Sequence, residues 1–259
     1  MKLNIVPART GITWVKLGIQ TFFKQPLALT GLFFLYMAAA TLASMIPFLG
    51  VVIALALVPA ATLGLMAATQ VAIGGRFPMP AVLISAFRAG RQRARAMLVL
   101  GFLYAAACLV VVSIVPLFFD VPVTAENALA PEMQGVMLAI LVLYMPISVL
   151  FWHAPALVHW HGVPPVKSLF FSAVVCFRNA GAYTLFGLAW MVVLVIMGVV
   201  VSLAAGLIGG PKVAAALLMP VALLMAAMFS TSLYFTFRDS FEEPLVITTD
   251  DTPTPGETP

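Results

Sequence analysis

The most constraining feature of this sequence is the length of its stretches without a charged side chain. Between Lys24 and Arg238, five intervals of 51, 24, 34, 33 and 25 residues contain no Asp, Glu, Lys or Arg. About 20 apolar residues, each rising about 1.5 Å, suffice for a helix to cross the hydrocarbon core of a bilayer. The four shorter intervals therefore predict one transmembrane helix each. The longest interval predicts two, separated by the turn-forming sequence Pro47-Phe48-Leu49-Gly50.

The overall composition agrees with an integral membrane protein. Of the 259 residues, 63% are apolar and 8% are charged, whereas soluble domains have about 45–50% and about 25%. A water-soluble monomer is excluded, because such a chain cannot cover a globular surface with polar groups. The spans do not alternate apolar and polar residues, which excludes a transmembrane β-barrel. We predict an all-α polytopic protein with six transmembrane helices, at Leu27–Pro47, Val51–Ile73, Met97–Phe119, Val136–Trp160, Gly181–Leu207 and Val213–Phe237.

The positions of Lys and Arg predict the orientation of these helices. Twelve of the 13 basic residues lie in the segments on one side of the predicted spans, and Lys212 alone lies on the other. The longest loop on that other side instead carries Asp120, Glu126 and Glu132. Because short cytoplasmic loops are enriched in Lys and Arg, we expect both termini to be cytoplasmic.

The six spans group into three hairpins, and a cytoplasmic amphipathic segment precedes each one. In the first segment the apolar residues Ile12, Val15, Ile19, Phe22 and Phe23 share one helical face, which is typical of a helix lying in the membrane interface. The second segment begins at Pro80 and the third at Pro164-Pro165. A proline recurs within the second span of each hairpin, which favours a parallel repeat of three hairpins over chance similarity; these prolines are Pro59, Pro146 and Pro220.

The chain thus divides into three regions. Residues 1–26 form a cytoplasmic N-terminus with an interfacial helix, and residues 27–237 form the membrane domain. Residues 238–259 contain six acids and four prolines, a composition typical of a disordered cytoplasmic tail.

The predicted spans contain no charged residue, which argues against an enzyme or an ion-coupled transporter. Burying a charge in a membrane costs several kcal/mol, so such residues usually mark functional sites. The sequence also contains no phosphate-binding loop, no His-Glu-x-x-His motif and no Cys-x-x-Cys motif. We therefore expect no enzymatic activity and no cofactor. A basic soluble module for nucleic acid is also missing from the sequence.

The only cluster of ionisable side chains near a span is formed by His153, His159 and His161. One interpretation is a metal or haem site at the cytoplasmic end of the fourth span. The spacings of six and eight residues place these side chains around the helix axis rather than on one face, which disfavours shared ligation. We favour an interfacial belt, in which the imidazoles and the neighbouring Trp side chains lie at headgroup level.

Two further groups of residues are candidate sites. Arg88, Arg91, Arg93 and Arg95 follow the second span, and each contributes about 1 kcal/mol of attraction to an anionic leaflet. They either bind lipid headgroups or only determine the orientation. Polar residues within the spans either hydrogen-bond between helices or line a solute path; the candidates for a path are Gln70, Ser148, Ser230 and Thr231.

The sequence also resembles a known but uncharacterised family. The segments Pro7-Ala8-Arg9, Gly11-Ile12-Thr13-Trp14 and Phe22-Phe23-Lys24-Gln25-Pro26 resemble the start of proteobacterial six-helix inner-membrane proteins. The loop from Gly74-Gly75-Arg76-Phe77-Pro78 to Phe87-Arg88 is similar to their first cytoplasmic loop. A more distant likeness is to the membrane domains beside glycerophosphodiester phosphodiesterases, whose catalysis belongs to a separate soluble domain. The resemblance implies a bacterial inner-membrane location and no established activity.

Three functional hypotheses follow. The first is a non-enzymatic membrane protein for scaffolding, envelope maintenance or regulation of a partner. The second is a carrier or channel for a neutral or lipid-like solute, and the third is a metal or haem protein that uses the histidines. The expected partners are the bilayer, anionic headgroups on its cytoplasmic face, and a membrane protein or a second copy of the chain.

Overall fold

The computed structural model describes residues 2–119, 131–208 and 210–241, and the regular structure in these ranges is helical throughout. Within them, six helical segments are long and apolar enough to cross a membrane, which confirms the prediction of an all-α polytopic protein. These segments are Pro26–Ser44, Gly50–Ile73, Arg91–Leu117, Met133–Trp160, Ala180–Leu207 and Ala216–Phe241.

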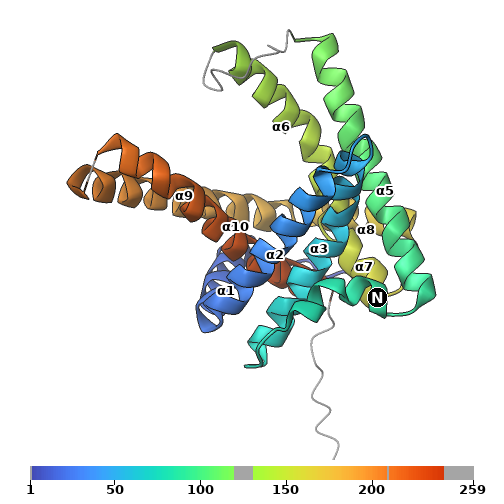
Figure 1. The fold of residues 1–259 in the computed structure, drawn as a ribbon. Helices are drawn as coiled ribbons and strands as arrows, with labels where there is room; N and C mark the ends of the chain where they lie inside the picture. Colours follow the sequence, from blue (N-terminus) through green and yellow to red (C-terminus); the bar gives the residue numbers. More distant parts are fainter. Residues whose placement is uncertain (1, 120–130, 209, 242–259) are drawn as a thin grey trace, which may run out of the picture.

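The long helices form three hairpins that diverge from a common base (Figure 1). The first hairpin is α2 (Pro26–Ser44) and α3 (Gly50–Ile73), the second is α5 (Arg91–Ile114) and α6 (Pro131–Phe151), and the third is α9 (Ala180–Ile208) and α10 (Pro211–Phe241). The first hairpin packs on α5 through α3, and the two helices approach closely where Gly101 on α5 faces the backbone of Ala56 on α3. The outer parts of the second and third hairpins extend in different directions (Figure 1).

Short helices precede the hairpins, as the sequence predicts. They are α1 (Thr10–Lys24) before the first, η1 (Pro80–Ile84) and α4 (Ser85–Arg88) before the second, and α8 (Pro165–Arg178) before the third. The 3₁₀ turn η2 (Val115–Leu117) extends α5. The prolines expected within the second helix of each hairpin lie inside α3, α6 and α10, while the three-hairpin repeat itself stays a hypothesis.

The apolar residues predicted to share one face of α1 are divided between protein contacts and the surface of the isolated chain. Ile12 and Phe23 are more than half exposed, whereas Phe22 is buried. Trp14 is also buried, and it contacts Phe186 on α9 and Asp239 on α10. The reason is close helix packing, because a Cβ added at Gly11 would lie 2.0 Å from the carbonyl oxygen of Ala182. The missing side chain at Gly11 therefore lets α1 approach the backbone of α9 closely.

The fourth predicted span is two helices instead of one. Helix α6 ends at Phe151, and α7 (Ala154–Trp160) begins after a break at Trp152 and His153. Pro155 lies in the first turn of α7, where its missing N–H needs no partner, but it cannot continue the hydrogen bonding of α6. The break directs α7 toward the base of the molecule, which is the end where the three hairpins meet. All of the α7 residues from Ala154 to Val158 are buried there.

The last helix extends past the predicted boundary of the acidic tail. Helix α10 runs to Phe241, so residues 238–241 belong to the folded domain rather than to a tail. Phe241 is 1% exposed. Residues 242–259 of the predicted tail lie outside the described residues.

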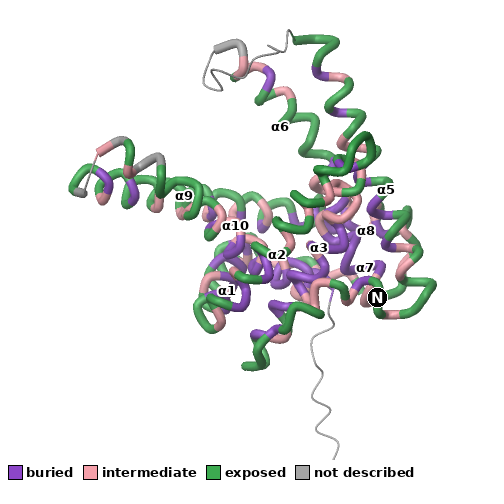
Figure 2. Tube along the Cα trace, in the orientation of Figure 1, coloured by how far each residue is buried: buried purple, intermediate pink, exposed green. Residues whose placement is uncertain are grey.

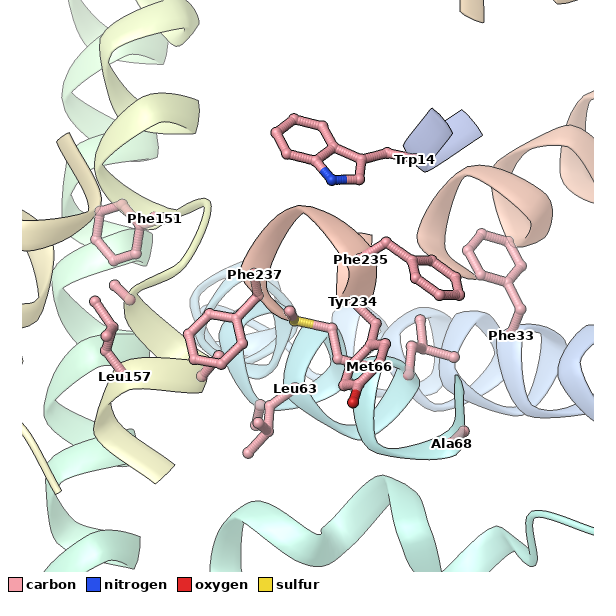
Figure 3. Packing of buried hydrophobic residues seen from close by; sticks show 14 of the residues in the cluster. Trp14, Phe33, Leu63, Met66, Ala68, Phe151, Leu157, Tyr234, Phe235 and Phe237 are labelled. Atoms are coloured by element: carbon pink, nitrogen blue, oxygen red, sulfur yellow. The ribbon is translucent and has the colours of Figure 1, made fainter. Parts of the chain in front are cut away.

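The buried residues gather at the base, where α1, α3, α7, α8 and the end of α10 meet (Figure 2). Phe237 and Tyr234 on α10 lie close to Met66 and Leu63 on α3 (Figure 3). The outer parts of the hairpins are different, since large apolar side chains there, such as Leu138 and Val195, are about 60% exposed in the isolated chain. In a bilayer these side chains contact lipid tails.

Candidate functional site

A buried polar cluster lies at the base, centred on His153. The His153 ring is fully buried, and its Nε2 shares a hydrogen bond with the Tyr183 hydroxyl. The His153 backbone N–H donates to Ser172 Oγ at 3.0 Å, and the Ser172 hydroxyl donates to the Val149 carbonyl at 2.8 Å. Tyr183 also lies 3.4 Å from Ser240 Oγ. These bonds engage the backbone N–H and the Nε2 of His153 at the break between α6 and α7, and they join α6, α8, α9 and α10. The buried Nδ1 of His153 has no hydrogen-bond partner among the described residues.

The N-terminal segment is attached to the same cluster through Asn179. The Asn179 side chain accepts a hydrogen bond from the Val6 N–H at 2.9 Å and donates one to the Asn4 carbonyl at 3.0 Å. The Asn4 N–H donates to the carbonyl of Ser240 at 3.0 Å. Residues 4–6 therefore connect the start of α9 with the end of α10.

The carboxylate of Asp239 provides a second attachment for the N-terminal part of the chain. The Trp14 indole N–H donates to Asp239 Oδ2 at 2.8 Å, and Arg238 pairs with Oδ1 at 2.8 Å. The indole of Trp14 is fully buried. A hydrogen bond to a charged group contributes about 1.5–3 kcal/mol, so this bond holds α1 firmly against α10.

A cleft of about 910 Å³ lies above this cluster, between the second and third hairpins. Its wall is aromatic: Trp152 packs edge-on against Phe186 with ring centroids 6.1 Å apart, and Trp190 packs against Phe229 at 5.6 Å. Further apolar side chains from α6, α9 and α10 complete it, among them Met145, Leu194 and Met225.

The polar groups of the cleft are few and neutral. Ser148, Cys176, Tyr183 and Thr184 border it, and none of the residues that line it is Asp, Glu, Lys, Arg or His. Ser148 Oγ donates to the carbonyl of Met145 at 2.7 Å. Burial raises the pKa of the Cys176 thiol to about 12, so it stays protonated at neutral pH. The cleft can therefore hold an apolar chain with a few hydroxyl contacts, but it offers neither a charge nor a reactive nucleophile.

The residues proposed for a polar path are not brought together at this cleft. Ser148 borders it, but Gln70, Ser230 and Thr231 are not among its lining residues. Gln70 is exposed on α3. The hydroxyls of Ser230 and Thr231 both donate to the carbonyl of Ala227 within their own helix.

The three histidines lie in different environments. His153 is fully buried, His159 is half-buried and His161 is exposed. Partial burial lowers the pKa of His161, which favours its neutral form. Within the described ranges no three His, Cys, Asp or Glu side chains converge to hold a metal ion. His153 instead contacts aromatic rings, with Phe241 at 5.4 Å and Phe237 at 5.8 Å between centroids.

The four arginines are exposed but differ in their surroundings. Arg88 lines a second, shallower cavity of about 580 Å³ between the end of α3, η1, α4 and α7. Arg91, Arg93 and Arg95 lie in the first turns of α5 and do not line this cavity. The spacing of the four arginines in the sequence does not indicate this difference.

The sequence analysis did not identify several residues of these sites. Asn179 and Asp239 have partners more than 170 residues away in the chain, and no local pattern encodes such a separation. The aromatic wall does have a signal, because Tyr183, Phe186 and Trp190 follow one another at helical spacing on α9.

Comparison with known proteins gives one informative similarity. No protein-family model matches the chain, and no solved structure matches it. A protein of Burkholderia thailandensis that bears the name "probable inner membrane protein" is 37% identical to this chain over 256 residues. The similarity covers 93% of this chain and 94% of the relative.

Proposed function

Because this chain belongs to the same family of inner-membrane proteins as its Burkholderia thailandensis relative, we propose that it binds a membrane lipid without catalysing a reaction. The observation that carries this proposal is the apolar cleft between the second and third hairpins. The cleft lies among helices that are long enough to cross a bilayer. A ligand that reaches it from the membrane is a lipid or another apolar solute.

The chemistry of the cleft favours a lipid tail over an ion or a polar metabolite. Ligand sites of about 300–1,000 Å³ are usually apolar with a few placed polar groups, and this cleft of about 910 Å³ follows that pattern. Lipid tails are as apolar as the cleft, so desolvation does not drive binding. Affinity comes from packing against the rigid aromatic wall, and the hydroxyl of Thr184 is available to an ester or glycerol group.

The same lining supports a non-enzymatic role. Acid–base catalysis needs a titratable group in reach of the ligand. The cleft lining contains no carboxylate, imidazole or amine, and its titratable groups are the Tyr183 phenol and the Cys176 thiol. Covalent catalysis by Cys176 needs the thiolate, but the high pKa of this thiol opposes its formation.

We further propose that both termini are cytoplasmic, on the basis of the distribution of Lys and Arg. In this orientation the cluster around His153 lies near the cytoplasmic surface and the cleft extends from it into the inner leaflet.

Filling the cleft tests the proposal. Gly187 borders the cleft and has open space around its Cβ position, so Gly187→Phe adds bulk there without a backbone clash. Gly198 on the same helix also has open space but does not line the cleft, which makes Gly198→Phe the matched control. We expect native mass spectrometry to show a lipid bound to the wild type and to Gly198→Phe, and loss of this lipid from Gly187→Phe.

Two outcomes contradict the proposal. A wild-type protein that retains no lipid after purification in a mild detergent lacks the site. Equal retention by Gly187→Phe and Gly198→Phe places the bound lipid elsewhere on the surface. Dithionite quenching of fluorescent lipids in reconstituted vesicles then separates a lipid carrier, which accelerates exchange between leaflets, from a protein that only binds.

A further inference from the structure

The cavity beside Arg88 lies on the predicted cytoplasmic side of the molecule, away from the cleft between the hairpins. It is bordered by the loop after α3, by η1 and α4, and by the end of α7. Three side chains with polar groups line it: Ser85, Arg88 and His159. The rest of the wall is apolar and includes Phe77, Met79 and Val82.

Two of these polar side chains have a buried atom without a partner. In the described part of the chain, only three buried side-chain nitrogen or oxygen atoms lack a hydrogen bond, and two of them are Ser85 Oγ and His159 Nδ1. Leaving such an atom unpaired costs about 1–3 kcal/mol, and an unpaired group in a native fold requires an explanation. A ligand that hydrogen-bonds to both atoms supplies one.

The charge around the cavity indicates the sign of that ligand. The Arg88 guanidinium is exposed and makes no ion pair with any described residue. Arg93 lies near enough for its charge to act on the His159 imidazole. No carboxylate lines the cavity, so its charge favours an anionic ligand.

We propose that this cavity binds the phosphate group of an anionic phospholipid. A serine hydroxyl, an imidazole N–H and a guanidinium are three donors, which suit the several acceptor oxygens of a phosphate. The apolar side chains Phe77, Met79 and Val82 favour a phosphate that carries a glycerol and acyl chains over free phosphate. The site is independent of the proposed function, because it lies in a different cavity and needs no occupant in the cleft.

The four arginines also differ in their position relative to the cavity. Arg88 is part of the site and Arg93 reinforces it through space, whereas Arg91 is an exposed neighbour that does not line the cavity. A diffuse attraction to an anionic leaflet would involve all four equally. This difference provides the matched control.

The experiment is a titration of the purified full-length protein with dioctanoyl phosphatidylglycerol, followed by native mass spectrometry at physiological ionic strength. We expect Arg88→Gln to weaken binding by about tenfold, the usual effect of one charge-assisted hydrogen bond. Ser85→Ala should weaken it several-fold, and it removes no hydrogen bond of the folded protein. Arg91→Gln should stay within about twofold of the wild type, since salt screens exposed charges.

Competing ligands identify the source of the phosphate. Dioctanoyl phosphatidylcholine should bind more weakly than phosphatidylglycerol, and inorganic phosphate should displace the lipid only at far higher concentration. Equal losses in Arg88→Gln and Arg91→Gln overturn the proposal in favour of diffuse charge attraction. Displacement by inorganic phosphate at equal concentration overturns it in favour of a site for free phosphate. If Arg88→Gln does not elute as a folded protein, the phosphatidylglycerol affinity of Ser85→Ala becomes the test of the site. Unchanged binding in that variant refutes the site.

Discussion

The packing of α1 against the third hairpin leads to a sharp prediction for Gly11. A Cβ built on Gly11 lies 2.0 Å from the Ala182 carbonyl oxygen and 2.7 Å from the Phe186 backbone nitrogen. Ordinary van der Waals contacts of a Cβ fall at 3.4–4 Å, and both obstacles are backbone atoms that cannot rotate away. The substitution Gly11→Ala therefore forces α1 to move away from α9 by more than about 1 Å. Backbone shifts of this kind are what destabilises overpacked cores.

The energetic cost follows from what this movement disturbs. Overpacking in a well-packed core costs about 1–3 kcal/mol. The movement also strains the bond between the Trp14 indole and Asp239, in a position where Trp14 is fully buried. We expect Gly11→Ala to lower the free energy of unfolding by about 3 kcal/mol, at the upper end of this range, because neither the backbone of α9 nor the bond to Asp239 can adapt.

The assay is thermal unfolding of the purified protein, in which size-exclusion chromatography with fluorescence detection measures the fraction that remains folded at each temperature. For a chain of this size, 1 kcal/mol corresponds to about 2–4 °C in Tm, so Gly11→Ala should lower Tm by about 6–12 °C. The matched control is Gly31→Ala on α2, where a Cβ meets nothing within 4 Å. Equal Tm values for the two variants would refute the packing of α1 on α9.

Two other predictions concern the base of the molecule. Asn179→Ala should make the N-terminal segment cleavable by added protease at a rate at least several-fold above wild type, because residues 4–6 lose two hydrogen bonds to this side chain; an unchanged cleavage rate would mean that other contacts hold the segment. In a Cys108→Ser background, alkylation of Cys176 by iodoacetamide should be slow at pH 8 and rise about tenfold per pH unit up to pH 10, because its pKa of about 12 leaves little thiolate below that value. A rate that levels off near pH 9 would indicate an ordinary thiol. Because folding favours the protonated thiol, this group also makes stability fall as pH rises above the pKa of an unfolded cysteine, about 8.5.

The transmembrane architecture was predictable because its cause is local. Helix length is fixed by bilayer thickness, so the distances between Lys24, Arg76 and later charges were enough to count six spans. The break at Trp152 and His153 was harder to predict, since Pro155 is equally compatible with a kinked continuous helix. What distinguishes the two is the burial of α7 against distant helices, which depends on the whole fold.

The candidate sites were predictable only as residue types. His153 is conspicuous in the sequence, but its partner Tyr183 lies 30 residues later in the chain. Ser240, which is the second partner of the Tyr183 hydroxyl, lies much farther away in the sequence. Arg88 and Arg91 are equivalent in any local pattern, and only the placement of η1 and α7 makes one of them part of a cavity. The packing role of Gly11 could not be predicted from the sequence, because it depends on the position of Ala182 in the folded protein.

The contrast between the base and the hairpins explains how a cleft persists in a protein of this composition. In water, the exposed apolar side chains of α6 and α9 would drive the two hairpins together. In a bilayer the surrounding tails are as apolar as these side chains, so no comparable force closes the gap. The base is held instead by directional bonds, such as those of Asn179 and Asp239, which act equally well beside a membrane. The second and third hairpins are therefore fixed at one end, and in a bilayer lipid tails surround their other ends, so we expect the cleft between them to stay open in the membrane.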